Sequence, residues 1–81
     1  AKELGPENIR CLAIAPGIIM TERAQEMEAN MPDLFKGLRE GIPMQKTGEM
    51  QDIAELVCWL LSDAAKYISG VTIPIDGGRT A

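Results

Sequence analysis

Residues Ile9 to Gly17 read IRCLAIAPG, and this stretch decides the fold. Its second half is continuously apolar and does not alternate between apolar and polar residues. Such a run is typical of a strand covered on both faces, as in the parallel sheet of an α/β fold. Pro16 and Gly17 end the run, and ligands of open α/β sheets bind at this end of the strands. We therefore predict a buried strand over 9–15 with a binding function where it ends.

The most regular element is a helix predicted over 49–62. Its apolar residues recur at the three- and four-residue spacings of one wide helical face, and they are Met50, Ile53, Leu56, Val57, Leu60 and Leu61. A last strand is predicted over 71–75. It should lie at a sheet edge because Pro74 has no backbone N–H. Two strands joined through a long helix form a parallel crossover unit, so this part of the chain also predicts an α/β fold.

Two short helices are predicted between the first strand and the long helix. They cover about 21–30 and 33–40, with Pro32 as the break between them and Gly41 as the end of the second. The first five residues, AKELG, read as the end of a helix stopped by Gly5 and Pro6. The whole chain is then one segment of a single domain: helix end 1–5, strand 9–15, turn and insertion 16–46, helix 49–62 and edge strand 71–75.

Composition excludes several classes of function. The net charge is -4 and the eight basic residues are scattered, so neither nucleic acid nor a membrane surface is an expected partner. The chain has no histidine, which removes Ser-His and Cys-His nucleophilic sites and the usual zinc sites, and we expect no metal. Cys11 and Cys58 stand far apart in apolar surroundings and indicate two reduced, buried thiols. No apolar stretch is long enough for a membrane span, so a cytoplasmic protein is expected.

Three stretches together resemble the short-chain dehydrogenase/reductase family. Asn8 to Thr21 resembles the sixth strand of that family with its PG-x-x-x-T extension, and Gly48 to Gly78 resembles the penultimate helix and last strand, closing with D-G-G. Ala1 to Gly5 resembles the end of the helix that carries the YxxxK pair. PG-x-x-x-T alone is a weak signal, whereas the three stretches in order at the family's spacing are a strong one. The resemblance implies the C-terminal part of a Rossmann-type doubly wound parallel sheet: its last two strands, the long crossover helix and a helical substrate-lid insertion.

The resemblance also implies an NAD(P)-dependent oxidoreductase. Its members transfer a hydride between the nicotinamide of NAD or NADP and a carbonyl or secondary alcohol, with a tyrosine as general acid/base. The Gly-rich phosphate turn, the catalytic serine and the YxxxK pair would all lie before Ala1, and Tyr67 is at the wrong end to replace that tyrosine. We therefore expect no catalytic residue in this chain and no activity from it alone.

Four residues are candidate cofactor contacts by the resemblance: Pro16, Gly17, Ile19 and Thr21. In the family this turn lies against the nicotinamide, Ile19 offers its main-chain amide and carbonyl to the carboxamide, and the Thr21 hydroxyl bonds the carboxamide or the diphosphate. Three of them also have a plain structural interpretation. Pro16 and Gly17 suit any turn after a strand, and Thr21 is a preferred helix N-cap.

Four residues are candidate substrate contacts of the lid: Met20, Met27, Met31 and Phe35. Methionine is flexible enough to fit different ligands. Without the resemblance, however, such side chains most simply pack a helical pair onto the body of the protein. Among the other residues, Asp76 to Gly78 suit a turn, Glu26 and Glu28 suit solvent, and Cys58 and Trp59 suit the core or a subunit interface.

The alternative function is a non-catalytic one. Family members are commonly homo-oligomers, tetramers or dimers, in which the long helix and the last strand are where subunits meet. The chain could then serve as an oligomerisation or binding segment of a Rossmann-fold protein. A YxxxK pair upstream of Ala1 would favour the enzyme over this alternative.

Overall fold

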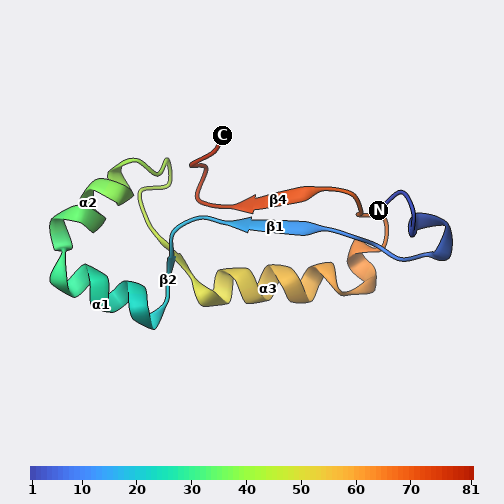
Figure 1. Ribbon diagram of the computed structural model, residues 1–81, viewed down its shortest axis with the longest axis horizontal. Helices are drawn as coiled ribbons and strands as arrows, with labels where there is room; N and C mark the ends of the chain where they lie inside the picture. Colours follow the sequence, from blue (N-terminus) through green and yellow to red (C-terminus); the bar gives the residue numbers. More distant parts are fainter.

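A computed structural model describes residues 1–81 and shows an elongated α/β arrangement with principal extents of 50 × 24 × 20 Å. Strands β1 (Ala13–Pro16) and β4 (Thr72–Ile75) pair in parallel, with Ile14 opposite Ile73 and Ala15 opposite Pro74. Helix α3 (Met50–Leu60) lies along this pair, and helices α1 (Glu22–Asn30) and α2 (Pro32–Glu40) project at one end (Figure 1). The parallel crossover expected from the sequence is thus confirmed.

The crossover helix α3 begins and ends for identifiable reasons. The Asp52 carboxylate accepts a hydrogen bond from the Glu49 backbone N–H at 2.8 Å, and Glu49 is the N-cap, just outside the helix. At the other end the Arg10 guanidinium donates to the Leu60 carbonyl at 2.6 Å, which places a positive charge at the negative end of the helix dipole. The helix is therefore shorter at both ends than the predicted 49–62.

The predicted strand 9–15 has different bounds in the structure, because regular pairing begins only at Ala13. Within residues 1–81 the strand is covered on one face only, since Ala13, Ala15 and Pro16 are exposed. Alternating side chains point to opposite faces, so Arg10, Leu12 and Ile14 reach α3, where they line a cavity of about 290 Å³ with Val57 and Leu60. No element of the chain packs on the other face of the strand.

The remaining predicted bounds also shift. The chain start forms a single turn and then a short 3-10 helix, η1 (Gly5–Glu7), because proline is tolerated in a first helical turn. This element ends at Asn8 with a left-handed backbone (φ 61°), two residues beyond the stop expected at Gly5 and Pro6. A second 3-10 helix, η2 (Asp63–Ala65), follows α3. Pro32 begins α2 for the same reason that Pro6 is tolerated in η1.

A second parallel pair closes the base of the helical insertion. Strand β2 (Ile19–Met20) pairs with strand β3 (Gly48–Glu49), so the residues entering the insertion meet the residues leaving it. The sequence pattern does not predict this pair. It fixes where the insertion joins the crossover unit, next to the end of β1.

The buried core is small and lies at two places. Only Phe35, Ile42, Leu60 and Ala65 are buried, the first two in the insertion and the last two at the end of α3 and in η2. Cys11 is half-buried and Cys58 is exposed, so the prediction of buried thiols is wrong, although both are free as expected. Each helix is too short or too polar to span a bilayer.

Candidate functional site

Residues 16–21 form the strand-end segment, which leaves β1 and enters α1. Pro16 is the last residue of β1, and the Gly17 N–H donates to the Ile75 carbonyl at 3.0 Å. A Cβ atom at Gly17 would lie 2.7 Å from Cβ and 2.8 Å from Cα of Asp76. The absence of a side chain at Gly17 is thus required by the neighbouring backbone, whether or not a ligand approaches.

Ile19 is held by the β2–β3 pair. The Gly48 N–H donates to the Ile18 carbonyl at 2.9 Å, and a Cβ at Gly48 would lie 2.7 Å from Cδ1 of Ile19. Gly48 therefore lets the Ile19 side chain lie against the backbone, a role that sequence reasoning missed. The Ile19 carbonyl accepts from the Thr21 N–H at 3.0 Å and, as any carbonyl oxygen, has a second lone pair.

Thr21 is the N-cap of α1. Its hydroxyl oxygen accepts from the Ala24 N–H at 3.2 Å, which satisfies one of the free donors of the first turn. This bond uses the hydroxyl as an acceptor only. The hydroxyl hydrogen is still available to a ligand, so the capping role and the cofactor role are chemically compatible.

The predicted lid residues on the two helices fall into two groups. Met27 is 40% exposed and Met31 is 44% exposed, and neither lines the cleft between α1, α2 and the start of α3. Phe35 is only 4% exposed and belongs to the small core, because its position on α2 faces inward. This burial favours the packing interpretation of Phe35 that the sequence also offered.

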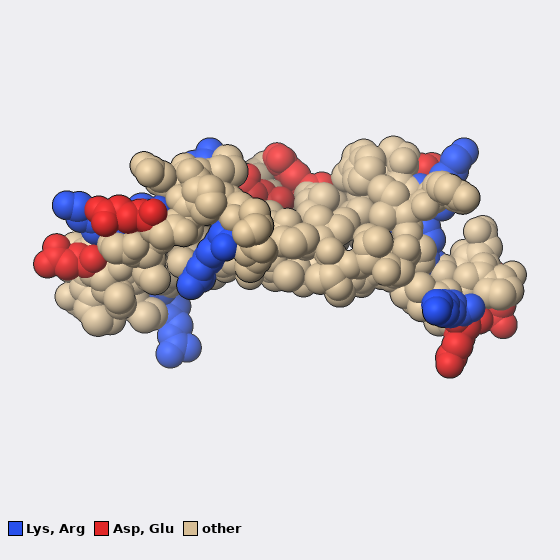
Figure 2. Space-filling model, turned by 90° about the horizontal axis from the view of Figure 1, so that it is seen from above, with Lys and Arg blue, Asp and Glu red and all other residues tan.

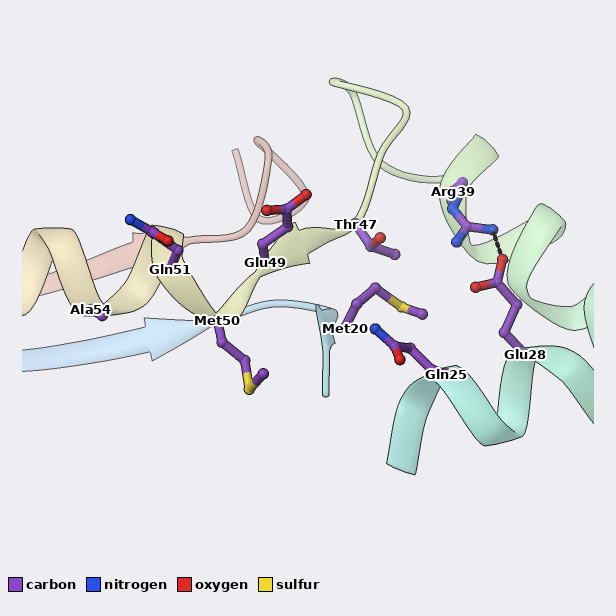
Figure 3. Close-up of a pocket in the computed structure, with 9 residues that line it drawn as sticks. All are labelled: Met20, Gln25, Glu28, Arg39, Thr47, Glu49, Met50, Gln51 and Ala54. Carbon is purple, nitrogen blue, oxygen red and sulfur yellow. Dashed lines mark ion pairs between the residues drawn. The ribbon is translucent and has the colours of Figure 1, made fainter. Parts of the chain in front are cut away.

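The cleft between α1, α2 and the start of α3 has a volume of about 810 Å³ (Figure 3). Three apolar and six polar residues line it: Met20, Met50 and Ala54, and Gln25, Glu28, Arg39, Thr47, Glu49 and Gln51. Of the eight predicted site residues only Met20 belongs to this lining. Its side chain extends toward Gln25, one helical turn into α1. The polar members come from α1, α2, β3, α3 and the loop before β3, which is why no local motif indicated them.

An ion pair joins helices α1 and α2 at the edge of this cleft. The Glu28 carboxylate on α1 lies 2.5 Å from the Arg39 guanidinium on α2, and both side chains are about one-third exposed. The hydrogen bond from Arg39 lowers the pKa of Glu28 below its ordinary value, and the same bond raises the pKa of Arg39. The expectation that Glu28 is merely solvated is therefore wrong.

Asp76 organises the turn that follows β4. Its carboxylate accepts from the Thr80 hydroxyl at 2.6 Å, the Gly78 N–H at 3.0 Å and the Thr80 N–H at 3.2 Å. These bonds, the one from the Thr80 side chain first, lower the pKa of Asp76 below its ordinary value. Gly77 and Gly78 take positive φ angles of 66° and 91°, as a turn of this kind requires. Asp76 has a structural role here, as the sequence indicated.

This lowered pKa gives a testable pH dependence. A carboxylate whose folded pKa is depressed stabilises the fold above its ordinary pKa of about 4 and loses that effect as the pH falls through the folded pKa. Asp76→Asn should therefore lower the thermal unfolding midpoint of the complete protein near pH 7, and the gap to wild type should shrink as the pH falls below about 4. Thr80→Val, which removes the strongest hydrogen bond, should behave likewise. A gap that stays constant down to pH 2 would contradict the assignment.

Nowhere in the structure do three Cys, Asp or Glu side chains gather so that they could hold a metal ion. The polar groups of the strand-end segment are instead a backbone carbonyl and a hydroxyl. Such groups suit hydrogen bonds to an organic ligand.

Comparison with known proteins places this arrangement in a family. The family described as enoyl-(acyl carrier protein) reductase matches residues 1–80. The A-factor type gamma-butyrolactone 1'-reductase (1S-forming) of Streptomyces virginiae is 40% identical over 80 residues, which cover 99% of this chain and 31% of that protein. The chain belongs to the short-chain dehydrogenase/reductase family and spans about a third of the length of the curated relatives it matches.

Solved structures agree with this placement. The structure of 4-hydroxyisoleucine dehydrogenase complexed with NADH is 36% identical with a TM-score of 0.89, and the match covers 99% of this chain and 32% of that chain. The structure of ElxO with NADP bound is 32% identical with a TM-score of 0.89, again over 99% and 32% of the two chains. The α/β fold with parallel strands thus matches about a third of these cofactor-binding structures.

Proposed function

We propose that the chain is the C-terminal third of an NAD(P)-dependent oxidoreductase that transfers a hydride between the nicotinamide and a carbonyl or secondary alcohol. The family membership and the relatives that bind NADH or NADP support this reaction class. The observation that carries the proposal is the strand-end segment. At the end of β1 it presents a carbonyl with a spare lone pair at Ile19 and a hydroxyl with a spare hydrogen at Thr21.

These two groups fit the nicotinamide carboxamide, which offers an N–H₂ donor and a carbonyl acceptor. The Ile19 carbonyl would accept from the amide and the Thr21 hydroxyl would donate to the carbonyl oxygen or to the diphosphate. Pro16 and Gly17 fix how the chain leaves β1 toward Ile19, since the Gly17 N–H bonds the Ile75 carbonyl and its Cα packs against Asp76. The cofactor supplies the hydride chemistry, and these residues orient it. The proton donor would lie outside residues 1–81.

The helical insertion would form the substrate lid. Met20 lines the cleft directly after Ile19, so a substrate there would lie next to the nicotinamide end of the cofactor. Met27 and Met31 are exposed on the same insertion and would contact a substrate only if the lid moves toward it.

Replacing Thr21 tests the proposed cofactor contact. In the complete enzyme Thr21→Ala should weaken NAD(P)H binding by about 0.5 to 1.5 kcal/mol, the net value of one hydrogen bond, or a few-fold to about tenfold in affinity. Thr21→Ser keeps both the cap and the hydroxyl and should bind nearly as wild type. Cofactor affinity is measured by fluorescence titration of folded protein. Equal affinities of the alanine and serine variants would contradict the contact.

A second candidate role is assembly into a homo-oligomer. Five large hydrophobic residues on or after α3 and before β4 are exposed: Met50, Trp59, Leu61, Tyr67 and Val71. On the face seen in Figure 2, which is the side of β4 in Figure 1, a broad band between the charged ends shows no Lys, Arg, Asp or Glu. We propose that α3 and β4 meet a second subunit. The mass of the complete protein in solution tests this role, and a monomer with full cofactor affinity would refute it without affecting the oxidoreductase proposal.

A further inference from the structure

The cleft beside Met20 is lined by more negative than positive side chains. Two carboxylates, Glu28 and Glu49, line it, and Arg39 is its only cation. Lys46 lines the neighbouring cavity of about 250 Å³, where Asp52 and Asp76 are also present. The uncharged polar groups of the cleft are the side chains of Gln25, Thr47 and Gln51, and the last donates to Glu55 at 2.9 Å.

Arg39 is already engaged. Its Nη1 lies 2.5 Å from Oε1 of Glu28, and its guanidinium carbon lies 6.0 Å above the centre of the Phe35 ring on the same helix. The dashed contact in Figure 3 marks this pair at the rim of the cleft. Only Nη1 of Arg39 contacts Glu28, but an anionic ligand bound to the remaining guanidinium N–H groups would lie close to the Glu28 carboxylate and be repelled by it. The ion pair thus neutralises the only cation of the cleft.

We propose that the cleft accepts uncharged, hydroxylated ketones or alcohols and rejects their phosphate- or carboxylate-bearing analogues, with Glu28 as the residue that withholds Arg39 from an anion. The proposal rests on the proposed function, since it takes this cleft as the substrate site. An anionic group here would lose water without gaining a free cation and would meet two carboxylates. Hydroxyl groups would instead find both donors and acceptors in Gln25 and Thr47.

The test compares a matched pair of probes, sorbitol and sorbitol 6-phosphate, which differ only in the phosphate group. Their affinities are measured by calorimetry on the complete enzyme loaded with cofactor. Wild type should bind sorbitol about tenfold or more tightly than its phosphate ester. Glu28→Gln should free Arg39 for a charge-assisted hydrogen bond and strengthen binding of sorbitol 6-phosphate by about tenfold or more, with little change for sorbitol.

Two further variants make the result specific. The double variant Glu28→Gln with Arg39→Gln should lose the gain, because the freed cation is absent. Glu26→Gln removes an exposed carboxylate of the same helix that does not line the cleft, and it should leave both affinities unchanged. Unfolding midpoints of all variants verify that they are folded.

Three results would overturn the proposal. They are equal or tighter binding of the phosphate ester by wild type, equal strengthening of both probes by Glu28→Gln, and binding of neither probe to the cofactor-loaded enzyme. Failure of the proposed oxidoreductase function is distinguishable from these, because it would show as absence of NAD(P)H binding by the folded protein before any probe is added.

Discussion

Prepared alone, residues 1–81 should show no cooperative unfolding transition and no dehydrogenase or reductase activity. Only four of 81 residues are buried, and the radius of gyration is 15.8 Å. A compact domain of this length would have a radius of about 12 Å. Ordering the backbone costs about 1 to 2 kcal/mol per residue, which so small a core does not offset. The two-stranded sheet also has open edges, to which other chains can pair.

The lack of dehydrogenase or reductase activity is expected for a separate reason. The chain has no histidine, and Tyr67 is fully exposed beyond the far end of α3, so no tuned proton donor lies near the strand-end segment. Thermal unfolding, sedimentation and NAD(P)H titration of the purified chain check both halves. A monomer that unfolds cooperatively and binds cofactor at micromolar concentration would show that residues 1–81 are a self-sufficient domain.

Gly17→Ala in the complete enzyme should lower both the free energy of unfolding and the affinity for NAD(P)H. The added Cβ would lie 2.7 Å from Cβ and 2.8 Å from Cα of Asp76, so backbone must move at the point where β1 ends and the turn after β4 begins. Overpacking of this kind destabilises proteins by about 1 to 3 kcal/mol. The displacement would also reach Ile19 and Thr21, so cofactor affinity should fall together with stability.

Gly37→Ala is the matched control. Gly37 lies inside α2, and a Cβ there meets no atom within 4 Å. Since alanine favours the helix interior over glycine by about 0.5 to 1 kcal/mol, this variant should be as stable as wild type or slightly more so. Denaturant unfolding of both variants gives the comparison. A Gly17→Ala variant as stable as Gly37→Ala would contradict this prediction, because it would mean that the backbone at Asp76 moves aside at no cost in stability.

The elements in which apolar residues recur at a regular spacing were predictable from the sequence. Helix α3 has apolar residues from Ile53 to Leu60 on one face, and its type and approximate place followed from that spacing. The parallel sense of β1 and β4 followed from the helix between them. Strand burial did not follow, because the continuously apolar pattern of Ala13 to Ala15 describes a sheet with both faces covered and the chain itself covers one.

The candidate site was predictable only where it follows the chain. The strand-end segment is contiguous, so Thr21 could be predicted from the sequence as a helix cap, which the structure confirms, and proposed as a cofactor contact. The cleft joins Gln25, Arg39 and Glu49 from three elements, and the two-residue strands that bring them together carry no periodicity. The buried state of Phe35, in contrast to exposed Met27, depends on how α1 packs on α2, which residue type alone does not specify.

The β2–β3 pair has a consequence for how this fold can diversify. Because Ile19 and Gly48 are partners, residues 21–47 leave and rejoin the crossover unit at a single point. Lengthening a segment whose ends are already held together costs little, since the closure entropy grows only slowly with length. The helices of the insertion can therefore be replaced or extended while Ile19 and Thr21, the proposed cofactor contacts, keep their places.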